Sequence, residues 1–209
     1  MDIMALVDKG GILMFPIAGA SVVAFMLFFE RIWSLRESRV VADELHRRIV
    51  GLLHSKRYDS AEAACAADPS SLARLALIAL KYRDRNREGI KNLMEEAGAL
   101  EARKMSRFVE GVGTVAAVSP LLGLLGTVTG MIRVFKEVAD AAEPHIGQLA
   151  GGIWEALITT GAGLTVAIPS YLAYRWLQGL VEERLYVLQE RSVEILDALD
   201  EGQIEDGTS

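Results

Sequence analysis

The sequence predicts an all-α membrane protein with three transmembrane helices and long cytoplasmic helical extensions. Three stretches contain no charged side chain: residues 11–29, 111–132 and 156–174, which are 19, 22 and 19 residues long. At about 1.5 Å of rise per residue, they form helices of roughly 28 to 33 Å, which match the ~30 Å hydrocarbon core of a bilayer. Helices buried in a large soluble core are the alternative, but those carry an apolar stripe, whereas these segments are apolar on every side.

The first span follows a short amino-terminal segment, residues 1–10, and is expected to be retained. Residues 18–20 (Ala-Gly-Ala) resemble the cleavage site of a secretory signal. However, the leader carries two acidic residues against one lysine, and apolar residues continue through Phe29 beyond the supposed cut. The first transmembrane helix is therefore predicted over residues 11–29.

Residues 30–110 form a large segment with a helical pattern of apolar residues. Leucine and isoleucine recur at helical spacing after the first span, which predicts that its helix continues to His54. A short amphipathic helix over 60–67 is expected to stop at Asp68-Pro69, because a residue before proline disfavours helical backbone. The remaining elements predicted here are a helix over 72–83 capped by Ser70 or Ser71, a turn near Asn86, and a helix over 88–110 that runs into the second span.

The distribution of positive charge predicts the orientation in the membrane. Residues 31–110 hold 16 of the 22 Lys and Arg, whereas the connection over 133–154 holds two. By the positive-inside rule the large segment is cytoplasmic, which places the amino terminus in the periplasm together with the 133–154 loop and the start of the third helix. The third transmembrane helix is predicted over 155–174, and residues 175–209 are predicted as a cytoplasmic helix with an acidic tail.

Composition excludes several classes of function. The net charge of −6 arises mainly from residues 175–209, which contain nine acidic residues and three Arg. No basic block with interleaved aromatic residues occurs in the sequence, so no nucleic-acid binding is predicted. Cys65 is the only cysteine and the three His are far apart in sequence, so no metal site or cofactor is predicted. An enzyme is the least favoured class, because the sequence offers no nucleophile–base pair and no phosphate loop.

Small residues follow one face of each of the last two spans. In the second span, 111–132, they are Ser119, Gly123, Gly126, Thr127 and Gly130, and in the third they are Gly152, Ala156, Thr160, Gly163 and Ala167. In lipid, such residues favour association because they let another backbone come close. Two stripes exceed what one hairpin needs, so we expect close packing between subunits or around a foreign helix. Packing within the chain alone is the alternative.

Prolines, one acidic residue and several threonines complete these two spans. Pro120 and Pro169 each remove a backbone hydrogen bond, which marks either a tolerated kink or a place where backbone approaches water or a moving neighbour. Glu155 lies just inside the third span, where an ionised group is costly, so it should face the protein interior or a hydrated path. The alternative is a carboxylate at headgroup level beside Trp154. The threonine hydroxyls, taken singly, are expected to bond carbonyls of their own helix: Thr127, Thr129, Thr159 and Thr160.

Together these residues resemble a known family. The run 119–128 (SPLLGLLGTV) is followed by 152–157 (GIWEAL), and then by Thr160, Gly163-Leu164 and Ala167-Ile168-Pro169. This pattern is similar to the signature of the MotA/TolQ/ExbB proton-channel family. The order of one span, a large cytoplasmic segment and two spans resembles the ExbB/TolQ branch, whereas MotA-like stators usually carry four spans.

The resemblance implies a function that composition does not reveal. Family members form a pentameric ring around two transmembrane helices of an ExbD/TolR-type partner, whose membrane aspartate carries the proton. By position, Thr127 and Thr160 would be pore-facing hydroxyls near that aspartate, and Glu155, the family's glutamate of the third span, would belong to the same ion pathway. The residues implied for helix packing and kinks around the partner are Pro120, Gly123, Gly126, Gly130, Gly163 and Pro169. The transported ion would be H⁺, with Na⁺ as the alternative, and the motor would act in the bacterial inner membrane on a TonB- or TolA-like protein.

Three other functions remain open on the sequence. The chain could be a non-conducting membrane scaffold, in which the small-residue stripes only assemble a complex. It could also be a MotA-like stator of another motility or envelope system. A small secondary transporter is less favoured, because the spans show no internal repeat symmetry.

Overall fold

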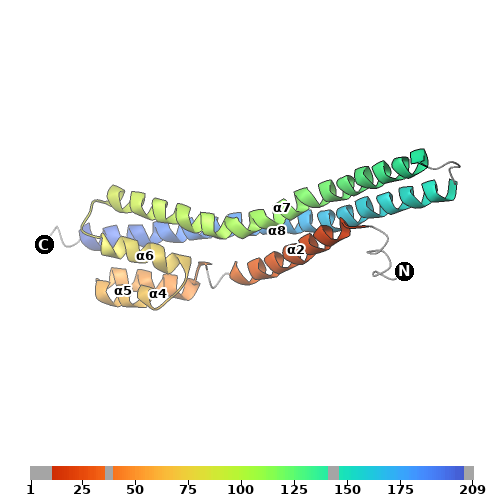
Figure 1. Cartoon of the computed structure of the whole chain (residues 1–209). Helices are drawn as coiled ribbons and strands as arrows, with labels where there is room; N and C mark the ends of the chain where they lie inside the picture. The colour runs from red at the N-terminus through yellow and green to blue at the C-terminus, as the bar shows by residue number, and fades with distance from the viewer. Residues whose placement is uncertain (1–10, 36–39, 141–145, 205–209) are drawn as a thin grey trace. The chain divides into compact units, whose positions relative to one another are not determined.

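The regular structure of the described residues is helical. A computed structural model describes residues 11–35, 40–140 and 146–204. The helices discussed below are α2 (Met14–Ser34), α4 (Asp43–His54), α5 (Tyr58–Ala66), α6 (Ser71–Lys81), α7 (Arg87–Asp140) and α8 (Ile146–Ile204), drawn in Figure 1. The predicted all-α class is thereby confirmed.

Three of these helices, α2, α7 and α8, are long and apolar enough to cross a membrane. α7 and α8 contain 54 and 59 residues, so each is far longer than a bilayer requires. Both continue without a break from an apolar part into a charged part. The predictions that the helix over 88–110 runs into the second span, and that the third span extends beyond residue 174, are confirmed.

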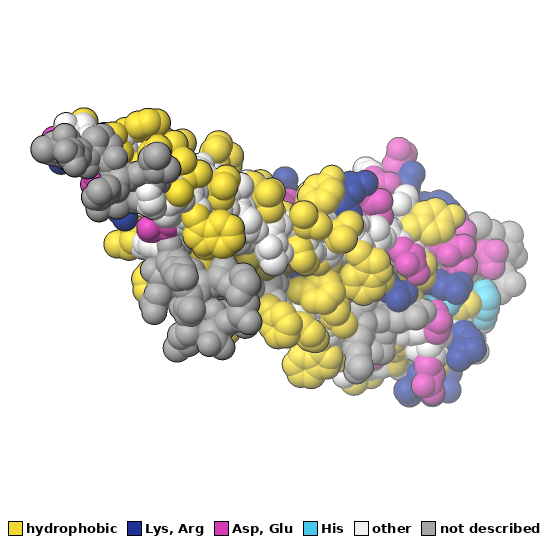
Figure 2. Space-filling view, turned by 90° about the vertical axis from the view of Figure 1, so that its right-hand side faces the viewer, with side chains coloured by type: hydrophobic (Ala, Val, Ile, Leu, Met, Phe, Trp, Pro, Cys, Tyr) yellow, Lys and Arg dark blue, Asp and Glu magenta, His cyan; other side chains and the backbone are white. Residues whose placement is uncertain are grey.

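The chain forms two compact units, and α7 and α8 each contribute to both. One unit comprises Met1–Glu30 and Phe108–Trp176, and we call it the span unit. The other comprises Arg31–Arg107 and Leu177–Ser209, and we call it the extension unit. Hydrophobic side chains cover much of the span helices in Figure 2, whereas Lys, Arg, Asp and Glu gather on the extension helices. An apolar exterior is what lipid contact requires of the span unit.

Amphipathic helices build the core of the extension unit. Ile49, Leu53, Leu72, Leu80 and Ile195 are all at most 1% exposed. The predicted helix over 60–67 is confirmed as α5, and the one over 72–83 as α6, with ends shifted by one or two residues. Of the two candidate caps for α6, Ser70 is the N-cap, since its hydroxyl accepts a hydrogen bond from the Ala73 amide at 3.2 Å.

The prediction of one helix from the first span to His54 is wrong. α2 ends at Ser34, and α4 begins only at Asp43, after Ala42 has adopted an extended backbone (φ −88°, ψ 98°). Val40 and Val41 precede this residue and are buried. Helical spacing was preserved across the interruption, so it did not reveal a break. Asp43 and Glu44, which are favourable at the positive end of a helix dipole, are the signal that marked a new start.

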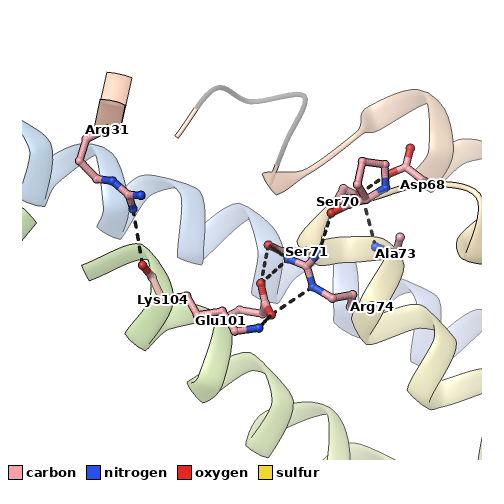
Figure 3. A network of polar contacts seen from close by, with 9 residues as sticks. Arg31, Asp68, Ser70, Ser71, Ala73, Arg74, Glu101 and Lys104 are labelled. Atoms are coloured by element: carbon pink, nitrogen blue, oxygen red, sulfur yellow. Dashed lines mark hydrogen bonds and ion pairs between the residues drawn. The ribbon is translucent and has the colours of Figure 1, made fainter. Parts of the chain in front are cut away.

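A buried carboxylate in the extension unit joins α6 to α7 (Figure 3). The Glu101 side chain is 6% exposed and accepts hydrogen bonds from Ser71 Oγ at 2.9 Å and from Lys104 Nζ at 2.8 Å. Arg74 donates its Nε to the same carboxylate at 3.1 Å. Burial acts to raise the pKa of Glu101, but the hydrogen bonds from these three donors outweigh it and lower the pKa from 4.5 to about 2.

Arg31 attaches the last turn of α2 to the same helix. Its guanidinium donates to the carbonyls of Met105 at 3.3 Å and Lys104 at 3.5 Å, and the residue is 5% exposed. The charge that the sequence assigned to the cytoplasmic end of the first span is therefore also a buried donor to α7. This contact and the Glu101 network lie within one turn of each other on α7, between residues 101 and 105.

Acidification should remove the stabilisation that Glu101 contributes. Because the pKa of Glu101 is lowered on folding, this stabilisation is present above about pH 4.5 and is lost as the pH falls towards about 2. The shift corresponds to at most about 3 kcal/mol, and the exposure of Arg74 and Lys104 reduces that figure. In detergent, the midpoint of thermal unfolding of the wild type should be higher than that of Glu101→Gln at about pH 7, and the two midpoints should approach each other at about pH 3. Glu62→Gln, on an exposed position of α5, is the control; a gap between wild type and Glu101→Gln that does not change with pH would contradict the expectation.

Candidate functional site

The last two spans meet along a seam of small residues in the span unit. An added Cβ at Gly123 of α7 would lie 3.0 Å from the Thr160 Cα of α8, and one at Gly163 would lie 2.6 Å from the Ser119 carbonyl oxygen. At Gly126 the same atom would collide with the Thr159 side chain. Backbone therefore packs against backbone along this seam, which we call the α7–α8 seam.

The seam accounts for the small-residue stripes within one chain. Beyond the central contact, an added Cβ at Gly130 would meet Ala156 at 3.0 Å, and one at Gly152 would collide with Val134. The glycines thus serve the hairpin of the chain itself, which was the alternative reading of the stripes. Packing of the same residues around a partner stays a prediction that rests on the resemblance.

Threonine hydroxyls in the spans mostly bond their own helices. Thr127 donates to the Leu124 carbonyl at 2.7 Å, Thr129 to Leu125 at 2.9 Å, and Thr159 to Glu155 at 3.2 Å. The expectation of bonding within the helix is confirmed for these three residues. The hydroxyl groups are accordingly satisfied without leaving a buried donor unpaired.

Thr160 departs from this pattern, so the prediction for its hydroxyl was wrong. Its Oγ1 donates across the seam to the Gly123 carbonyl of α7 at 2.9 Å. The close approach of the Gly123 backbone is the cause, because no side chain separates the carbonyl from α8. Thr160 therefore joins the two spans by a hydrogen bond that sequence periodicity alone did not predict.

Thr127 and Thr160 lie on the same side of the seam. Successive residues of an α-helix differ by about 100°, so Thr127 follows the seam residue Gly126 by that angle, and Thr160 follows Thr159 likewise. Along the seam, residues of rising number in α7 contact residues of falling number in α8, so the two helices are antiparallel. On two antiparallel helices that face each other, a step of one residue from the seam turns the side chain towards the same side of the pair. The structure therefore brings the two predicted pathway hydroxyls to one flank.

Glu155 lies on the opposite flank, against the start of the first span. It borders a small cavity of about 30 Å³ whose lining includes residues 11–13, Thr129 and Arg133. Its carboxylate lies 3.6 Å from the Arg133 guanidinium and is 40% exposed. The structure therefore does not group Glu155 with Thr127 and Thr160. The sequence did place Arg133 and Glu155 at facing ends of a predicted hairpin, but nothing in their spacing indicated an ion pair.

Pro120 and Pro169 both lie inside continuous helices. A hydroxyl next to each proline donates to a backbone carbonyl of the same helix: Ser119 to Val115 and Ser170 to Val166, both at 2.7 Å. Both are i to i−4 bonds of a serine within helical backbone beside the proline, and the carbonyls that the prolines free are different ones, those of Ala116 and Thr165. The helix nevertheless continues through both positions.

Large apolar side chains on the flank of Thr127 and Thr160 are not covered by the residues that the structure describes. Leu124 of α7 lies one turn before Thr127, Leu157 and Leu164 of α8 lie one turn either side of Thr160, and the three are 44–60% exposed. Such a surface cannot face water. It is suited to lipid or to further helices.

Comparison with known proteins identifies relatives of the chain. A model of the MotA/TolQ/ExbB proton channel family matches residues 67–190, which include Thr127, Thr160 and Glu155. The ExbB-like biopolymer transport protein 1 of Synechocystis sp. is 36% identical over 185 residues, covering 85% of this chain and 71% of that protein.

Relatives named TolQ and ExbB occur in other organisms. The Tol-Pal system protein TolQ of Pseudomonas aeruginosa is 30% identical over 176 residues, covering 78% of this chain and 75% of that protein. The biopolymer transport protein ExbB of Neisseria gonorrhoeae is 35% identical over 133 residues, covering 57% of this chain and 60% of that protein. The family is of the transport and channel type rather than a known enzyme family. The match over more than half of the sequence, together with three helices fit to span a membrane, means that the chain belongs to the MotA/TolQ/ExbB proton channel family.

Proposed function

We propose that the chain is an ExbB/TolQ-like subunit of an ion-driven motor of the bacterial inner membrane. The observation that carries this proposal is the flank of the α7–α8 seam, where Thr127 and Thr160 stand beside Leu124, Leu157 and Leu164, apolar side chains that the described residues leave exposed. The first span lies at the other flank, with residues 11–13 beside Glu155. The open flank is therefore available to other helices.

Five copies of the chain would form a ring with this flank turned inward. The partner would be of the ExbD/TolR type, with a single span per chain, two such spans inside the ring, and a membrane aspartate near Thr127 and Thr160. The names of the TolQ and ExbB relatives support a role in Tol-Pal or biopolymer transport systems. The motor would accordingly act on a TonB- or TolA-like protein.

The membrane potential supplies enough energy for such a motor. One elementary charge that crosses the membrane yields about 2.3 kcal/mol per 100 mV. Protonation of the partner's aspartate removes a buried charge, which lets the partner helix move to the next subunit, and deprotonation holds it there. Five subunits around two helices cannot all be equivalent, so rotation follows naturally. The ion is H⁺ in this proposal, and Na⁺ is the alternative because hydroxyls coordinate either.

The proposed orientation follows from charge. The extension unit carries the basic residues beside the spans, among them Arg31 and Arg107, so it lies in the cytoplasm together with the carboxyl terminus. The amino terminus and the α7–α8 connection then lie in the periplasm. Glu155, near that connection, lies towards the periplasmic end of its span.

A non-conducting scaffold is the second candidate, and one observation favours it. The hydroxyls of Thr127 and Thr160 are already bonded to backbone carbonyls, as they would be if they served packing alone. A MotA-like stator of another system would share the same inner flank. The scaffold differs from both in passing no ions.

The test is co-expression with the partner in a strain that lacks both genes. We expect force-dependent envelope function to require both proteins and to fail when a protonophore collapses the gradient. Replacing the proton gradient by a sodium gradient shows which of the two ions drives the function. Function that is normal in both Thr160→Val and Glu155→Ala would contradict the site assignment, and function that survives loss of every ion gradient would favour the scaffold.

A further inference from the structure

Three segments of the span unit converge on the Glu155 carboxylate. The guanidinium of Arg133, from α7, lies 3.6 Å away. Gly11, which precedes α2, approaches so closely that an added Cβ would stand 3.2 Å from Glu155 Oε1. All three residues line the same cavity of about 30 Å³. The carboxylate of α8 therefore lies beside α7 and beside the residues that lead into α2.

The backbone of Gly11 is specialised for this approach. Its φ is +68°, in the left-handed region that side chains other than glycine rarely adopt. Its carbonyl accepts a hydrogen bond from the Met14 amide at 3.1 Å, which makes a turn directly before α2. A side chain at this position would strain the turn and also press on the carboxylate. The left-handed backbone favours glycine here, and the lack of a side chain lets the carboxylate approach.

The charge of Arg133 completes the arrangement. Membrane-boundary carboxylates are costly unless a charge or water compensates them, and Arg133 is the cation placed beside this one. Lys136 follows it by three residues on α7 and is exposed, without contact to Glu155 among the described residues. Of these two cations on α7, only Arg133 is therefore placed to pair with Glu155.

We propose that Arg133 and Gly11 are positioning residues for Glu155, and that the three form a clasp that ties the first span to the α7–α8 hairpin. The expected effect of the clasp on ion movement rests on the proposed function. In the clasp, Glu155 lies on the flank opposite to Thr127 and Thr160. Glu155 then holds the hairpin against α2 while the threonines face the partner. Loss of any member weakens the attachment of the first span to the hairpin at this end.

The test compares single and paired variants of the subunit in complex with its partner. We expect Arg133→Gln and Gly11→Ala each to lower partner-dependent ion flux by about tenfold, as misplacement of a functional group does, and Glu155→Gln to do the same. When Arg133→Gln or Gly11→Ala is combined with Glu155→Gln, the flux should fall no further than in Glu155→Gln alone. Arg133→Lys and the exchange Arg133→Glu with Glu155→Arg should restore much of the flux, because they restore the ion pair.

Two matched controls accompany these variants. Lys136→Gln removes a neighbouring positive charge, and Gly19→Ala changes a glycine of α2 that has nothing within 4 Å of an added Cβ. Both should leave flux unchanged. Flux lowered equally by Lys136→Gln and Arg133→Gln, with no rescue by Arg133→Lys, would overturn the clasp.

Thermal unfolding of the same complexes, without any ion gradient, separates the clasp from the proposed function. The midpoint shifts of Arg133→Gln and Glu155→Gln should be less than additive in the double variant, because both remove one interaction. A complex that carries no flux but retains this coupling would refute the motor and keep the clasp as a structural device. Additive shifts together with normal flux in Arg133→Gln and Gly11→Ala would refute the clasp and leave the motor standing.

Discussion

Gly163→Ala should disrupt the α7–α8 hairpin, although alanine is the better helix former. The new methyl group would lie 2.6 Å from the Ser119 carbonyl oxygen and 3.0 Å from the Gly123 Cα, and both are backbone atoms that cannot move aside as a flexible side chain would. Overpacking of this kind costs about 1–3 kcal/mol. We therefore expect a lower midpoint of thermal unfolding in detergent and a smaller yield of assembled complex.

The matched control lies two residues away on the same helix. Gly161 is exposed, and nothing lies within 4 Å of an added Cβ there, so Gly161→Ala should be neutral within the chain or slightly stabilising. If the two variants unfold at the same temperature, the seam is not packed as described. If Gly161→Ala alone weakens assembly while unfolding normally, then Gly161 lies at a contact with another chain.

Thr160→Val should abolish most ion-driven activity while changing stability little. Valine matches threonine in shape but cannot donate to the Gly123 carbonyl, and loss of one such bond costs about 1 kcal/mol. Under the proposed function the lost hydroxyl also stood near the partner's carboxylate. A drop in flux of about tenfold or more is expected, measured per assembled complex, since electrostatic and hydrogen-bonding groups at a reacting site have effects of this size.

Two further variants make the Thr160 result specific. Thr160→Ser keeps the hydroxyl and should retain most of the flux. Thr165→Val removes an exposed hydroxyl of α8 that donates to the Gly161 carbonyl at 2.8 Å, and it should have little effect. Equal losses in Thr160→Val and Thr165→Val would indicate that hydroxyls on α8 serve helix packing alone.

Much of the helical organisation could be predicted from the sequence because it depends on local signals. The long uncharged stretches predicted the spans, Asp68-Pro69 predicted the end of α5, and Ser70 was one of two caps proposed for α6. The break before Asp43 was missed because apolar spacing continued in register across it. The local signal of the new start was the acidic pair Asp43 and Glu44, and the extended backbone of Ala42 makes the break.

The contacts of the candidate site were harder to predict, because they depend on which helices meet and how closely. Glycine stripes indicated close approach of backbones, but a stripe does not say whether the partner is the same chain or another. The bond from Thr160 to Gly123 follows only once the seam is known. The pairing of Arg133 with Glu155 depends on the register of the hairpin, and the role of Gly11 depends on a turn before α2.

Ion flux through a reconstituted complex tests the central claim most directly. The purified subunit, assembled with its single-span partner in sealed vesicles, would be given a potassium diffusion potential, and proton uptake would be followed with a pH-sensitive dye. The account predicts uptake that needs both proteins and is largely lost in Thr160→Val but not in Thr165→Val. An intact complex that passes neither protons nor sodium under this potential would contradict it.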